Sequence, residues 1–73
     1  MIDVEWCENK LSEARLRYDG RDPFGPWTDL NDIFKSLVNS TDRKIFVDFL
    51  NDKKHDSFWR DFINYFLNEH KIQ

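Results

Sequence analysis

Hydrophobic residues recur at spacings of three and four positions over four separate stretches of this chain, which is the pattern of helices that bury one face. The β-branched and aromatic residues of 42–51 would also suit a strand, but the apolar positions there are neighbours on a helix and do not alternate with polar ones. The pattern therefore predicts an all-α fold, a small compact bundle of four helices. The expected helices cover residues 3–19, 29–39, 42–51 and 57–70.

The first expected helix has a narrow apolar seam, with Trp6 and Leu16 lying off it. Gly20 follows where a helix stop is expected, since glycine readily adopts the left-handed backbone that ends many helices. The seam positions are Val4, Cys7, Leu11, Ala14 and Tyr18.

Both prolines and both glycines of the chain fall in residues 20–27, so we expect an ordered loop that no helix crosses. Phe24 and Trp27 are large apolar anchors within it, unlike the residues of flexible linkers. Thr28 or Asp29 is expected to cap the second helix. Its predicted packed face is Leu30, Ile33, Phe34, Leu37 and Val38, and Ser40 or Thr41 is expected to cap the third helix.

The last expected helix carries more aromatic residues than one packed face requires. Five of the eleven residues 57–67 are aromatic, and their apolar arc spans roughly 200°, about twice a single packed stripe. Such a helix either has neighbours on two sides or keeps a face for a partner. We expect Phe58, Phe62, Ile63 and Phe66 to lie mainly in the interior, whereas Trp59 has two alternatives, the core or an interface.

The 73 residues allow one helical domain, residues 1–73, with little apolar area to offset chain entropy. One cysteine and two histidines form neither an internal disulfide nor a spaced zinc-ligand set, so we expect no metal. The aromatic content of 16% offers two alternatives, a dense core or self-association, including a homodimer.

The net charge of −3 is spread without a basic stripe, so we do not expect a nucleic-acid partner. No apolar run approaches the eighteen or so residues of a membrane span, and no signal region opens the chain. With a single cysteine, these features predict a cytoplasmic protein that does not enter a membrane.

The sequence offers no set of residues suited to catalysis. Cys7 lies on the apolar seam, where a free cysteine behaves as a small inert hydrophobe. His55 and His70 stand in polar surroundings and are expected to be solvated, and Gly20 and Gly25 lack a phosphate-binding context. We therefore expect no enzyme, no cofactor and no small-molecule substrate.

The aromatic surplus favours a protein that binds another protein or itself, such as an inhibitor, an immunity- or antitoxin-like protein, or an accessory subunit. An alternative is a helix-turn-helix-like nucleic-acid binder, formed by the second and third helices around residues 39–41. The mixed charge of the third helix does not favour that alternative. The candidate partner-binding residues are Phe24, Trp27, Trp59, Trp6 and Tyr65.

Overall fold

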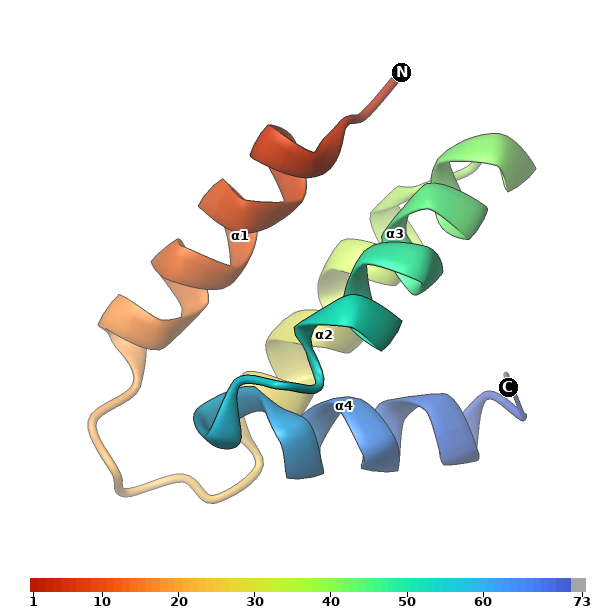
Figure 1. Cartoon of the computed structure of the whole chain (residues 1–73). Helices are drawn as coiled ribbons and strands as arrows, with labels where there is room; N and C mark the ends of the chain where they lie inside the picture. Colours follow the sequence, from red (N-terminus) through yellow and green to blue (C-terminus); the bar gives the residue numbers. More distant parts are fainter. Residues whose placement is uncertain (72–73) are drawn as a thin grey trace.

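The computed structural model describes residues 1–71 and confirms the predicted all-α class (Figure 1). No strand occurs in this part of the chain, which measures 33 × 23 × 22 Å along its principal axes. The four helices are α1 (Val4–Arg17), α2 (Gly25–Ser36), α3 (Ser40–Lys53) and α4 (Ser57–Glu69).

Helices α1 and α4 each pack against both α2 and α3. The most extensive of these contacts is the one between α4 and α2. Figure 1 shows α4 crossing the lower end of the bundle at a steep angle to α1 and α3. Side chains of α4 contact α2 at two places, Tyr65 on Trp27 near the beginning of α2 and Phe66 on Phe34 farther along it.

The first helix ends earlier than predicted. Helix α1 stops at Arg17 instead of residue 19, because Tyr18 turns into extended backbone. Gly20 has the left-handed φ of 84° expected of it, but it serves the following loop and not the helix end. Asp3 begins the helix by accepting a hydrogen bond from the backbone N–H of Trp6 at 2.8 Å.

Helix α2 begins at Gly25, four residues before the predicted start, and therefore includes part of the expected loop. Proline is tolerated in the first helical turn, where its missing N–H has no partner to lose, so Pro26 starts the helix instead of preventing it. Neither Thr28 nor Asp29 is the cap: Phe24 holds that position without a side-chain bond. The helix also ends early, at Ser36, which leaves Val38 91% exposed and not on the packed face.

Helix α3 is longer than predicted because its cap lies before the two expected candidates. The side chain of Asn39 accepts hydrogen bonds from the backbone N–H groups of Thr41 and Asp42, at 2.7 and 3.4 Å. Ser40 is therefore already helical. Helix α4 begins at Ser57 as predicted, with the Asp56 carboxylate accepting from the N–H of Phe58 at 2.9 Å.

The core joins the inner faces of all four helices. One face of α4, formed by Trp59, Ile63, Phe66 and Leu67, enters it, whereas Phe58 and Phe62 are only half-buried beside it. Tyr65 remains 54% exposed. The buried apolar residues are Cys7, Leu11, Ala14, Leu30, Leu37, Phe46, Phe49, Leu50, Trp59, Ile63, Phe66 and Leu67.

Candidate functional site

Three of the predicted partner-binding residues come together into one surface, which we call the aromatic patch: Phe24, Trp27 and Tyr65. Phe24 directly precedes α2, Trp27 lies in its first turn, and Tyr65 projects from α4. The ring centroids of Trp27 and Tyr65 are 5.4 Å apart with an interplanar angle of 83°. Those of Phe24 and Trp27 are 6.4 Å apart at 73°. These edge-to-face contacts join the three rings into a continuous apolar surface.

The exposure of the patch is unusual for this chain. Phe24 is 57% exposed and Tyr65 54% exposed, the highest values of any aromatic side chain within residues 1–71. Trp27, between them, is half-buried. Beside the rings lies an open hollow of about 460 Å³, lined by Trp27, Tyr65, Asn68 and Glu69. An apolar surface with polar groups at its rim is typical of protein-binding sites.

Asn31 links α2 to the end of α4, the two helices on which the rings of the patch are held. This residue, only 9% exposed, donates from Nδ2 to the carbonyl oxygen of Trp27 at 3.0 Å. Its Oδ1 then accepts a hydrogen bond from Nε2 of His70, just past the end of α4, at 2.7 Å. The His70 ring packs on Phe66 and Phe34, with centroid distances of 4.6 and 5.2 Å. His70 is thus half-buried and positioned, which corrects our expectation of a solvated side chain.

The indole of Trp27 is held by packing and not by a hydrogen bond. Its Nε1–H is buried and has no acceptor within the described part of the chain. The ring orientation is therefore set by its contacts with Phe24 and Tyr65 and by the helix that carries it.

The two other candidate tryptophans lie elsewhere. Trp59 is 2% exposed and contacts Phe58 and Phe62, so its inclusion among surface candidates is corrected: it belongs to the core. Trp6 is half-buried on α1, with Lys10 Nζ 5.4 Å from its ring centroid. The patch accordingly contains three of the five candidates.

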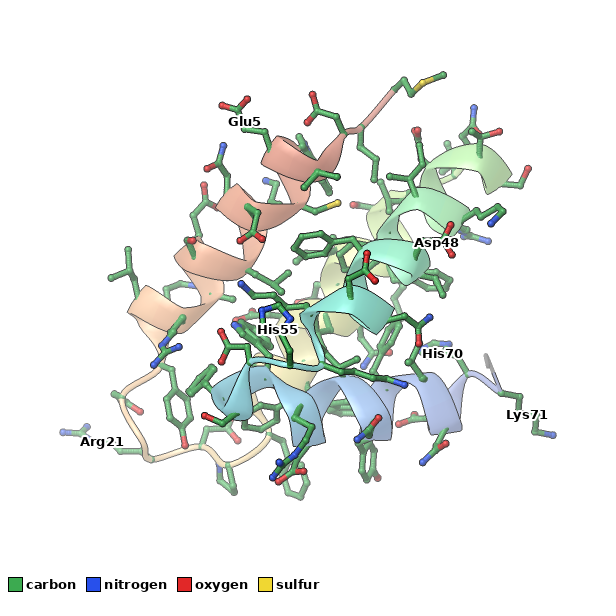
Figure 2. The ribbon with its side chains drawn as sticks, in the orientation of Figure 1. Glu5, Arg21, Asp48, His55, His70 and Lys71 are labelled. Atoms are coloured by element: carbon green, nitrogen blue, oxygen red, sulfur yellow. The ribbon has the colours of Figure 1, made fainter. Side chains whose placement is uncertain are left out.

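A second hollow, of about 310 Å³, lies between α1 and α3. Its apolar surface comes from Val4, Ile45 and Phe49, and acidic side chains surround it, among them Asp48, labelled in Figure 2. One of its charges is already engaged, since Lys53 Nζ lies 3.2 Å from a carboxylate oxygen of Glu8. These contacts are typical of the interface between two packed helices.

Cys7 lies in the core, as its position on the seam predicts. Burial, together with the nearby carboxylates of Asp3 and Glu8, raises the pKa of this thiol to about 11. The thiol is protonated at neutral pH, and a protonated, buried thiol is a poor nucleophile.

Three basic side chains on α3 and α4, which a nucleic-acid binder could use to contact phosphates, have partners within the protein. Arg43 stacks on Phe34 at 5.1 Å, Lys44 pairs with Asp48 at 3.0 Å, and Arg60 lies 3.4 Å from Asp61. Helix α3 therefore does not present a row of free cations, and these contacts do not favour the helix-turn-helix alternative.

Within residues 1–71, no three histidine, cysteine, aspartate or glutamate side chains are grouped so that they could hold a metal ion. None of the helices in that range is both long and apolar enough to cross a membrane. Comparisons with protein-family models, with curated proteins and with solved structures gave no match for this chain.

Proposed function

We propose that this chain is a non-enzymatic protein-binding module, and that the aromatic patch is its contact surface. The observation that carries the proposal is the joint exposure of Phe24 and Tyr65, 57% and 54%, on either side of Trp27. In a chain this small, aromatic rings are the main source of core area, and leaving two of them in solvent forgoes burial. A partner that covers the patch would bury these two rings and so supply that burial.

The patch is also arranged as an efficient binding surface. Aromatic side chains contribute much contact area for the loss of few rotatable bonds, and they dominate the energetics of many interfaces. The Asn31–His70 hydrogen bond and the Trp27–Tyr65 contact fix α2 relative to α4 before any partner arrives. A preformed surface loses less entropy on binding than a mobile one.

Several roles require a surface that binds another protein. An inhibitor, an immunity- or antitoxin-like protein and an accessory subunit all act by occupying another protein, and a homodimer would use the same surface on itself. We place this activity in the cytoplasm, where the lone buried Cys7 would meet no disulfide partner.

The first test is affinity capture with matched variants. The chain carrying both Phe24→Ser and Tyr65→Ser should lose the proteins that the unchanged chain retains. Leu16→Ser is the control, because Leu16 is 87% exposed, equally apolar and located on α1 outside the patch. Proteins retained by all three chains, or lost also with Leu16→Ser, would contradict a role for the patch.

The second test distinguishes self-association from a foreign partner. Light scattering across a range of concentrations gives the mass of the unchanged chain and of the double variant. A dimer that becomes monomeric only in the double variant assigns the patch to a second copy of the chain. A monomer in both assigns it to a different protein, for which the capture experiment decides.

A further inference from the structure

Three partly exposed aromatic rings of this protein make a cation–π contact with a lysine or arginine of the same chain. A positive charge over an aromatic face is attracted by the negative potential of the ring, and arginine makes this contact more often than lysine. The pairs are Arg15 over Phe58 at 4.3 Å, Arg43 over Phe34 at 5.1 Å and Lys10 over Trp6 at 5.4 Å, each measured to the ring centroid.

The aromatic patch lacks this feature, although its Phe24 and Tyr65 are more exposed than those three rings. Within residues 1–71, no lysine or arginine lies over Phe24, Trp27 or Tyr65. Lys71, the cation nearest in sequence to the hollow, projects beyond the end of α4, away from the bundle (Figure 2).

The hollow beside the patch also holds an acidic group. Glu69 lines it together with Trp27 and Tyr65, and no ion pair engages this carboxylate within the part of the chain that the structure describes. The planes of the Trp27 and Tyr65 rings meet at 83°, an arrangement that we call the aromatic corner, and Glu69 lines the same hollow. An aromatic corner with an adjacent carboxylate is complementary to a cation in both shape and charge.

We propose that this corner receives an arginine side chain of the protein partner. The inference rests on the proposed function and names the chemistry of the group that the partner presents. A planar guanidinium can stack on one ring while its N–H groups donate to both oxygens of Glu69, which a compact ammonium cannot do in the same geometry. The closest and second-closest cation–ring contacts inside the protein are likewise made by arginine.

The direct test compares a positively charged probe with a neutral one. N-acetyl-arginine amide and N-acetyl-citrulline amide have nearly the same shape, but the urea group of citrulline is neutral. Titration of each into the full chain is followed by NMR, through the indole N–H signals of the tryptophans and the ring signals of Tyr65. We expect arginine to bind on the order of tenfold more tightly than citrulline, with the shifts concentrated at Trp27 and Tyr65.

Two substitutions separate the contributions of the ring and the carboxylate. Glu69→Gln should weaken arginine binding by about two- to fivefold and leave citrulline binding unchanged. Its control is Glu13→Gln, since Glu13 is also an exposed acid but lies on α1. Tyr65→Leu keeps an apolar side chain and removes the aromatic face, and it should weaken arginine binding by about two- to fivefold.

The outcomes keep this inference separate from the proposed function. Equal binding of arginine and citrulline, shifts away from Trp27 and Tyr65, or no shift with arginine would each overturn the arginine site. Any of these results leaves the capture experiment to decide whether the patch binds protein at all. Conversely, if the double variant Phe24→Ser and Tyr65→Ser captures the same proteins as the unchanged chain, the proposed function fails even where free arginine binds.

Discussion

The inner side of α4 and the aromatic patch use the same kinds of residue for different ends. On the inner side, Trp59, Ile63 and Phe66 are at most 2% exposed. On another face of the same helix, Tyr65 is 54% exposed and meets Trp27 of α2. A small fold whose single cysteine can form no internal disulfide needs most of its aromatic rings inside, so the rings that stay outside are the better indicators of function.

The largest effect expected from this comparison is at Trp59. Replacing it with alanine removes a fully packed indole and leaves a cavity, which should reduce the free energy of unfolding by about 3–5 kcal/mol. Urea denaturation followed by far-UV circular dichroism measures this. A loss below about 1 kcal/mol would mean that Trp59 is not part of a tightly packed interior.

We also expect the protein to lose stability at high pH, because the buried thiol of Cys7 then becomes deprotonated. Its pKa is about 11 in the folded chain against an ordinary value of 9.0, so the folded state binds the thiol proton more tightly than the unfolded state. Stability from this group is complete below pH 9 and is lost as pH rises toward 11, by about 2–3 kcal/mol.

The control for this prediction is Cys7→Ala, which retains every other group that titrates in the same range. The difference in unfolding free energy between the unchanged chain and Cys7→Ala should shrink between pH 9 and 11. A difference that stays constant with pH would show that the thiol is solvated.

An intermediate effect is expected at Asn31, which lies between the interior and the patch. Asn31→Ala deprives the half-buried His70 of its acceptor and should cost about 1–2 kcal/mol in unfolding free energy. Asp32→Ala, at the exposed neighbouring position, is the control. If the two variants unfold at the same denaturant concentration, the bond between α2 and the end of α4 contributes nothing to stability.

The smallest effect is expected at the patch itself. Phe24→Ser and Tyr65→Ser, made singly, should each change the unfolding free energy by about 1 kcal/mol or less, because both side chains are more than half exposed. Thermal or urea unfolding measures this alongside Leu16→Ser. A loss as large as that of Trp59→Ala would place the patch in the core and remove the contrast between the two regions.

Much of the fold follows from the hydrophobic pattern, because helices that bury one face repeat their apolar residues with the period of the backbone. The pattern is less informative about helix ends, which depend on single caps. Asn39 was available as a cap one residue before the predicted candidates, and Pro26 was interpreted as a barrier although it can begin a helix.

The candidate surface could be predicted only in part. Exposed aromatics near prolines suggested Phe24 and Trp27, but the 200° arc of the last helix does not say which edge faces solvent. That depends on where α2 and α3 lie: the edge formed by Ile63 and Leu67 is buried, whereas Tyr65 at the other edge is exposed. The pairing of Asn31 with His70 joins positions far apart in sequence and leaves no periodic signal.

The origin of the aromatic patch in two distant segments also ties it to the order of folding. Phe24 and Trp27 belong to the start of α2, whereas Tyr65 belongs to α4, and neither half forms the three-ring surface alone. The surface exists only once α4 has docked on α2. A partner that requires all three rings would therefore distinguish completed molecules from nascent or partly unfolded ones, without any separate quality-control signal.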